Sequence, residues 1–324
     1  MDISGLWTLQ CMMFMLVAAG AILKKTGILK PESKDIITDL VIYFILPCNI
    51  INSFRTKFEI SILRSFLIVL GVSVAVQAVS YILSRTLYNR KPDAVKRVLQ
   101  YCTIVSNSGF LGLPIAEGVF GAEGMMYASI FIIPMRIMMW SAGIACFTES
   151  PDMKSVVKKL AVHPCIVAVY IGLPLLVLQE PLAALYAGIL ESSAPQLQVV
   201  VKMLVTAVDK MMRAAGGCTT TLTMVLIGTM LADVKAKDLL NGDALLITLV
   251  RQGILPALVL VVCRLLHVDA LLTGVCVLIT GMPAGSTSVI LAAKYHCDYI
   301  FATKCVVIST LLSMATIPLW CMVV

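Results

Sequence analysis

Two short stretches of the chain combine polar side chains with helix-breaking residues inside otherwise apolar segments. Glycine and proline interrupt a helix and free backbone N–H and C=O groups, which lipid cannot satisfy but a ligand can. A helix that restarts after such a break also offers partial positive charge at its N-terminus. The two stretches therefore predict a binding site for a small anionic group. Their candidate residues are Asn107, Ser108, Gly109 and Pro114 in the first stretch, and Pro283, Gly285, Ser286, Thr287 and Ser288 in the second.

Ten apolar segments must position these residues. Hydrophobic residues make up 60% of the 324, charged residues make up 13%, and the mean hydropathy is +0.97. A soluble domain averages roughly 45–50% apolar and about 25% charged residues, and roughly 20 apolar residues cross a bilayer. The composition predicts one all-α integral membrane protein. Its expected transmembrane helices lie near 6–23, 36–54, 65–87, 98–117, 124–147, 160–179, 213–232, 243–264, 270–292 and 299–323.

The distribution of lysine and arginine predicts how the chain is oriented in the lipid bilayer. Sixteen of these residues lie in the connections after odd-numbered helices and seven in the connections after even-numbered helices. Cytoplasmic connections are enriched in basic residues, so we expect the connections after odd-numbered helices in the cytoplasm. Both termini are then expected on the outer side of a plasma or inner membrane. The net charge of +7 follows from this topology, so it does not indicate nucleic-acid binding. Assembly as a homodimer stays open.

The two broken stretches lie five helices apart, in helix 4 and helix 9. Because five is an odd number, a second copy of a five-helix unit must be inverted relative to the first. We expect one transporter domain over 1–324, with inverted repeats at 1–147 and 159–324 joined by a short cytoplasmic linker at 148–158. Interrupted segments at corresponding places in inverted halves are typical of a transporter's binding site. The site is therefore predicted where helices 4 and 9 cross.

Polar side chains inside other spans are further candidates for substrate contact. Arg136 and Arg251 each lie within an apolar span, where a charge costs about 2.5–3.5 kcal/mol at the bilayer centre. The bundle interior, a carbonyl cluster or an anionic substrate should offset this cost, and substrate contact, gating and structural pairing all stay open. Asn49, together with Asn52 and Gln77, is a candidate on helices 2 and 3. The alternative there is an interhelical hydrogen bond, worth roughly 0.6 kcal/mol.

The sequence predicts neither a metal site nor a cofactor. The eleven cysteines contain no Cys-x-x-Cys pair, and the three histidines are far apart in the chain. Asp and Glu are absent from 98–116, 124–148, 160–179, 214–232 and 244–268. Because a cation antiporter ordinarily needs a buried carboxylate, this pattern argues against carboxylate-driven cation antiport.

An enzyme is not expected, because two possible protease motifs are incomplete. Ser-Asn-Ser-Gly at 106–109 lacks the first glycine of a rhomboid-type Gly-x-Ser-Gly, and no histidine lies in mid-span. Asn-Gly-Asp at 241–243 is a poor match to an aspartyl Gly-x-Gly-Asp because it falls in a loop. A channel, a receptor-like membrane protein and a sodium-coupled organic-anion symporter of the bile-acid type stay open as alternatives.

Several motifs together resemble those of the auxin efflux carrier family, which includes plant PIN-formed carriers and many short prokaryotic permeases. The resemblance covers nearly the whole chain and is strongest in 98–147 and 213–324. The motifs that carry it are Asn-Ser-Gly-Phe-Leu-Gly-Leu-Pro at 107–114, Phe-Gly at 120–121, Ile-Gly-Thr-Met-Leu-Ala at 227–232, Arg251 ahead of Leu-Pro at 255–256, Ala-Ala-Lys-Tyr at 292–295, Ser-Thr-Leu-Leu-Ser at 309–313 and Ile-Pro-Leu-Trp at 317–320.

The resemblance implies ten helices in two inverted repeats, with broken helices 4 and 9 crossing at the midplane. It also implies a scaffold formed largely by helices 1, 2, 6 and 7, and an elevator-like movement of the crossing part. Asn107 occupies the place of an asparagine that contacts substrate in the family. Ser288 and Thr221 stand where plant members often have proline, and the long cytoplasmic loop is absent at 148–158. We therefore expect a short prokaryotic-type secondary carrier that exports a small organic anion, either a carboxylate or an auxin-like acid.

Overall fold

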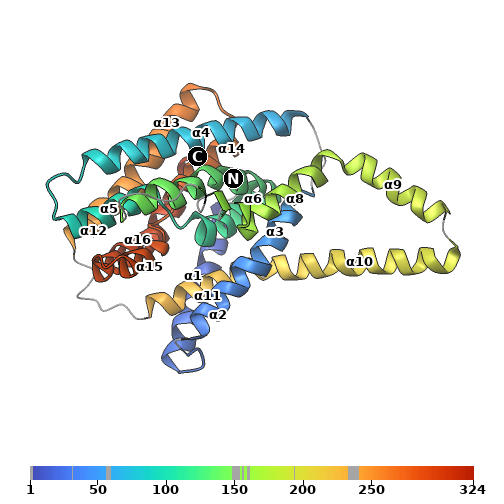
Figure 1. The fold of residues 1–324 in the computed structure, drawn as a ribbon, viewed down its shortest axis with the longest axis horizontal. Helices are drawn as coiled ribbons and strands as arrows, with labels where there is room; N and C mark the ends of the chain where they lie inside the picture. The colour runs from blue at the N-terminus through green and yellow to red at the C-terminus, as the bar shows by residue number, and fades with distance from the viewer. Residues whose placement is uncertain are drawn as a thin grey trace.

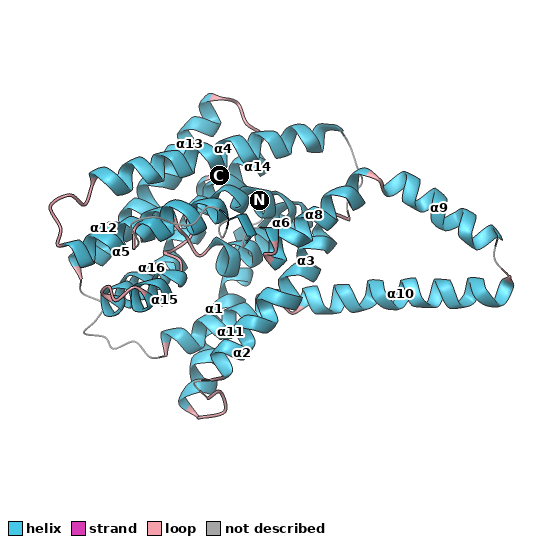
Figure 2. Cartoon of the chain, viewed as in Figure 1, coloured by secondary structure: helices cyan, strands magenta, loops and turns pink. Residues whose placement is uncertain are grey.

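The computed structural model describes residues 3–30, 32–55, 60–147, 154, 157–158, 161–192, 194–232 and 241–324, so most of the expected linker at 148–158 lies outside the described residues. Every regular element in the described part is helical (Figure 2), which confirms the all-helical expectation. Among the described residues, five helices are long and apolar enough to span a membrane, or six if a pair bent by 75° is counted as one span. Ten crossings and inverted repeats stay predictions.

One set of helices, called the first group here, comes from the N-terminal and middle parts of the chain. Its members are α1 (Ile3–Lys25), α2 (Ser33–Leu40), the π-helical η1 (Val41–Ile45), α3 (Leu46–Ser53), α8 (Pro164–Val177), α9 (Gln179–Ser192), α10 (Pro195–Gly217) and α11 (Thr219–Leu231). In this group α1 packs along α11, and α3 packs against both α8 and α10. These helices cover the four predicted spans that the family resemblance assigns to a scaffold.

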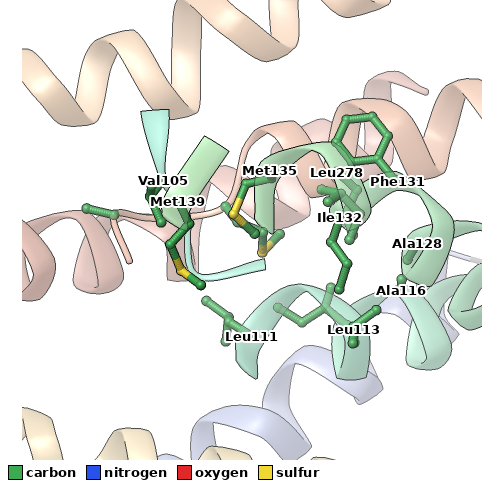
Figure 3. Close-up of a cluster of buried hydrophobic side chains, with 14 of the residues drawn as sticks. Val105, Leu111, Leu113, Ala116, Ala128, Phe131, Ile132, Met135, Met139 and Leu278 are labelled. Carbon is green, nitrogen blue, oxygen red and sulfur yellow. The ribbon is translucent and has the colours of Figure 1, made fainter. Parts of the chain in front are cut away.

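The remaining helices form the second group. Its members are α4 (Ile60–Thr86), α5 (Asp93–Ile104), the π-helical η2 (Ser108–Gly112), α6 (Leu113–Met138), the π-helical η3 (Met139–Gly143), α12 (Gly242–Leu249), the π-helical η5 (Val250–Ile254), α13 (Leu255–Leu265), α14 (Ala270–Thr280), α15 (Thr287–Lys294) and α16 (Tyr299–Val323). Here α6 packs against α4 and α14, and α16 packs against α12 and α15. Figure 3 shows the apolar interior of this group, where Phe131 and Ile132 of α6 lie beside Leu278 of α14.

Gly121 divides the long helix α6 between the predicted fourth and fifth spans. Its backbone has φ 68° and ψ −160°, a conformation that is not helical and that side chains with a Cβ strongly disfavour. The chain therefore turns at this residue, and helical residues lie directly on both sides of it. The expected boundary between spans 98–117 and 124–147 lies at this turn.

Helices α9 and α10 project away from the rest of the molecule (Figure 1). They occupy the segment that connects the predicted sixth and seventh spans. The predicted seventh span, 213–232, is wrong at its start, because α10 continues to Gly217 and α11 begins only at Thr219. The consecutive Gly216 and Gly217 weaken the helix here, since glycine is a poor helix former.

The contact between α1 and α11 depends on two glycines. A Cβ added to Gly228 would lie 2.0 Å from the Val17 carbonyl oxygen, and one added to Gly20 would lie 2.1 Å from the Val225 carbonyl oxygen. Neither obstacle is a flexible side chain, so the two backbones would have to separate. Small residues at such positions are what allow close helix packing within a bilayer.

Gly228→Ala is expected to lower the stability of the purified protein by roughly 1–3 kcal/mol, the usual cost of overpacking. Gly71→Ala on α4 is the matched control, because a Cβ there meets nothing within 4 Å and alanine favours a helix by about 0.5–1 kcal/mol. Thermal unfolding in detergent measures both variants. Equal unfolding temperatures for the two would contradict this account of the α1–α11 contact.

Candidate functional site

The two stretches singled out in the sequence lie side by side where two helices break. Helix α5 ends at Ile104, and the chain resumes as η2 at Ser108; α14 ends at Thr280, and α15 begins at Thr287. Between these ends, Ser106 and Ala284 form an antiparallel bridge. The backbone N–H of Asn107 donates to the Pro283 carbonyl at 2.8 Å, and that of Gly285 donates to the Val105 carbonyl at 3.1 Å. Each broken stretch therefore donates a backbone N–H to a carbonyl of the other stretch, so neither is left without hydrogen-bond partners at these positions.

Side chains around this crossing complete its hydrogen bonding. The Ser108 hydroxyl donates to the Ile279 carbonyl at 3.2 Å, so it joins the restart of one helix to the end of the other. The Ser309 hydroxyl of α16 accepts from the Ala284 N–H at 3.1 Å. Pro114 lies in the first turn of α6, directly after the π-helical turn η2. These residues hold the crossing together.

Arg251 lies in a carbonyl cluster at the C-terminal ends of both broken helices. Its side chain is 2% exposed. It donates to the carbonyl of Thr103 at 2.7 Å, of Thr280 at 3.2 Å and of Met282 at 3.3 Å. A helix C-terminus leaves carbonyls without intrahelical partners and carries partial negative charge. The guanidinium matches both properties, which favours the structural alternative for this residue.

Arg136 connects the second group to the first. Its Nη1 lies 2.7 Å from Nε2 of His163, the residue that precedes α8. A Cβ on Gly109 would lie 3.0 Å from Nη2 of Arg136, so the guanidinium also lies against the start of η2. Arg136 is 7% exposed, and its Nε has no hydrogen-bond partner. The contact with His163 joins α6 to the N-terminus of α8.

A cavity of about 510 Å³ lies between the two helix groups. Three of the predicted site residues line it, namely Asn107, Ser286 and Thr287. Asn107 is the residue before η2, yet its side chain does not cap that helix. The Thr287 hydroxyl is hydrogen-bonded to Tyr101 at 2.8 Å. The cavity therefore opens on the N-terminal ends of both restarted helices.

The other predicted site residues lie outside the lining of this cavity. Ser288 is fully buried. The remainder serve the crossing, the carbonyl cluster or contacts between the groups. They are Ser108, Gly109, Pro114, Pro283, Gly285, Asn49, Arg136 and Arg251.

Sequence reasoning missed several polar residues of the cavity wall. Lys304 and Thr303 come from α16, and Asp35 and Thr38 come from α2. Lys304 supplies a positive charge and is partly buried, whereas Asp35 is exposed in the first turn of α2, where a carboxylate suits the helix dipole. A signal for Lys304 did exist, because it lies inside the predicted span 299–323.

Asn49 joins the two groups through a carboxylate that the sequence analysis overlooked. Its side-chain nitrogen donates to Oε2 of Glu117 at 2.7 Å and to the Thr219 hydroxyl at 3.0 Å. Glu117 is partly buried and belongs to the apolar stretch Ser108–Met138. Glu117 lies one residue beyond the acid-free interval 98–116, so that interval did not include it. The helix continues past that point to the turn at Gly121.

Within the described ranges, no group of three or more His, Cys, Asp or Glu side chains could hold a metal ion. The polar groups of the cavity are amides, hydroxyls, one amine and one exposed carboxylate. These groups can bind a solute by hydrogen bonds and charge.

Comparison with known proteins places the chain in a family. A family model described as membrane transport protein matches residues 9–321. The chain belongs to this family of auxin efflux carrier-type transporters. It is also 24% identical over 314 residues to an uncharacterized transporter of Methanocaldococcus jannaschii, covering 94% of each chain. An uncharacterized transporter of Methanothermobacter thermautotrophicus is 25% identical over 313 residues, covering 95% of each chain. As a member of a membrane transport family with several apolar helices, the protein is a multi-pass membrane transporter.

Proposed function

We propose that this transporter is a secondary carrier that exports a small organic anion across the cell membrane. The observation that carries the proposal is the polarity of the crossing. Arg251 covers the C-terminal ends of the broken helices, whereas the N-terminal ends at Ser108 and Thr287 adjoin the cavity. N-terminal helix ends attract anions, so an organic anion fits the part of the crossing that the protein leaves open.

The cavity lining supports a carboxylate with an apolar body as the substrate. Asn107 can donate to a carboxylate, and the Lys304 ammonium adds a charge-assisted partner. Phe110, Ile227 and Val306 line the same cavity and suit the apolar part. A cavity of about 510 Å³ is within the range of small-molecule sites, roughly 300–1,000 Å³.

The division into two helix groups supports movement of one group against the other. The cavity lies between the groups, with Ile42 and Ile227 on the first and Asn107 and Thr287 on the second. A shift of the second group would carry the crossing with it, because both broken helices belong to that group. This is the elevator-type alternating access that the family resemblance implies. We place both termini on the outer, non-cytoplasmic side of the membrane, as the distribution of basic residues predicts.

The purified protein is expected to gain thermal stability from at least one acid in a panel of malate, succinate, pyruvate and indole-3-acetate. A ligand at 100 times its Kd stabilises the folded state by about 2.7 kcal/mol. The stabilising acid should then show saturable counterflow in proteoliposomes.

Three results would contradict the proposal. One is that no acid in the panel stabilises the protein or shows counterflow. Another is a conductance far above carrier rates, which would indicate a channel. Strict dependence of uptake on sodium would instead indicate the sodium-coupled symporter.

A further inference from the structure

The carboxylate of Glu117 lies where the two helix groups meet. Glu117 belongs to α6 of the second group, and its partner Asn49 belongs to α3 of the first. Asn49 is 5% exposed and also contacts Thr219 of α11, which is fully buried. Thr219 donates in turn to the Gly216 carbonyl at 2.6 Å. The carboxylate is therefore tied to two helices of the opposite group through one amide.

An ionisable group in an apolar span is costly, and such groups commonly carry protons or ions in transporters. Glu117 is only partly buried, so water can deliver a proton to it. Its neighbour presents N–H donors, since the Asn49 amide nitrogen bonds both Glu117 and Thr219. A donor hydrogen directed at the carboxylate suits proton exchange better than binding of a metal cation, which requires oxygen ligands.

We propose that Glu117 is the proton-coupling site of this carrier. The inference rests on the proposed transport function and assigns its coupling ion. The ionised carboxylate accepts a charge-assisted hydrogen bond from Asn49, which holds the second group against the first. A proton from the aqueous phase converts the carboxylate to a neutral acid, and a neutral hydrogen bond is roughly half as strong. The second group is then freed to move, and the proton leaves when Glu117 faces the opposite aqueous phase.

None of the other described titratable groups on the helices around α6 has a hydrogen bond to Asn49 like that of Glu117. Lys24 and Lys25 end α1, and Arg85 lies in the last turn of α4. Helix α11 contains no titratable side chain. The full set on the elements packed against α6, and on α6 itself, is Cys11, Lys24 and Lys25 of α1, Cys48 of α3, Arg64, Tyr81 and Arg85 of α4, Cys165 and Tyr170 of α8, Cys276 of α14, and Glu123, Tyr127 and Arg136 of α6.

Glu117→Gln tests the proposal, because glutamine retains an oxygen that can accept from Asn49. Glu123→Gln is the matched control, since Glu123 is an exposed glutamate on the same helix. Infrared difference spectra of the purified protein over a pH series should show a carboxyl group gaining its proton. This signal should disappear in Glu117→Gln and persist in Glu123→Gln.

Transport is then measured with radiolabelled malate and indole-3-acetate in proteoliposomes. In Glu117→Gln, counterflow should continue, whereas accumulation driven by an imposed pH gradient should fall at least tenfold. Either of two results would overturn the proposal: Glu117 does not titrate while the protein is folded, or Glu117→Gln accumulates substrate as the wild type does. If the wild type moves neither acid, the proposed transport function fails. The infrared titration then decides by itself whether Glu117 is a proton site, so the two proposals are tested separately.

Discussion

Arg251→Met is expected to destabilise the folded protein by roughly 3 kcal/mol, the largest effect on stability among the changes considered. Methionine fills a similar volume but donates no hydrogen bonds, so the carbonyls of Thr103, Thr280 and Met282 lose their shared partner. A buried acceptor without a partner costs about 1–3 kcal/mol. Relief of the cost of burying the guanidinium charge offsets part of the sum. Thermal unfolding in detergent should show a fall in the midpoint of roughly 5 °C or more.

Two further arginine variants test whether the loss of stability in Arg251→Met comes from the carbonyl cluster. Arg264→Met removes an exposed guanidinium that also donates to a backbone carbonyl, that of Val323 at 2.7 Å. Its cost should stay within about 0.5 kcal/mol, as for most surface changes. Arg251→Lys retains the charge but not the planar set of donors, so it should fall between the wild type and Arg251→Met. An Arg251→Met protein as stable as Arg264→Met would show that the carbonyl cluster does not hold the crossing.

The role of Arg251 marks how far the sequence could predict this site. The two broken stretches are recognisable because glycine, proline and polar residues within apolar spans are local signals. The partners of Arg251 are not local, since they lie 148, 29 and 31 residues away in the chain. A single charge in a span therefore left the bundle interior, a carbonyl cluster and a substrate open as explanations of what offsets its cost. Only the folded arrangement of α5, η5 and α14 distinguishes them.

The cavity wall shows a second reason why prediction stopped short. Asn107 and Thr287 were found because they lie within the breaks, but Lys304 and Asp35 lie on unbroken helices. Their place in the cavity wall depends on how α16 and α2 pack against the crossing. The hydrophobic pattern of the sequence does not predict this packing. Glu117 differs from these two residues, because it lies one position beyond the acid-free interval 98–116. Its importance depends on Asn49, 68 residues earlier in the chain.

Asn107→Ala is expected to weaken binding of the transported anion by about 10- to 100-fold. The side chain lines the cavity and does not cap its own helix, so its amide is placed for a solute. A hydrogen bond to a charged group contributes about 1.5–3 kcal/mol, and each 1.4 kcal/mol is a factor of ten in affinity. The crossing itself should persist, because its bond to Pro283 is made by the backbone N–H of Asn107. Counterflow of the stabilising acid measures the change in KM.

The control for this variant is Asn89→Ala, which removes an exposed asparagine in the turn after α4. It should leave the KM, the maximal rate and the unfolding temperature unchanged. Asn107→Asp should impair binding more than Asn107→Ala, because a carboxylate at this position repels the substrate carboxylate. The Asn107→Ala protein should unfold at nearly the wild-type temperature without ligand and lose most of the ligand-induced shift. An unchanged KM and rate in Asn107→Ala would mean that the anion binds elsewhere, whereas a large loss of stability without ligand would mean that the side chain supports the fold. Because the backbone bond and the side chain of one residue have separate roles here, stability and affinity measured together identify which role the side chain has.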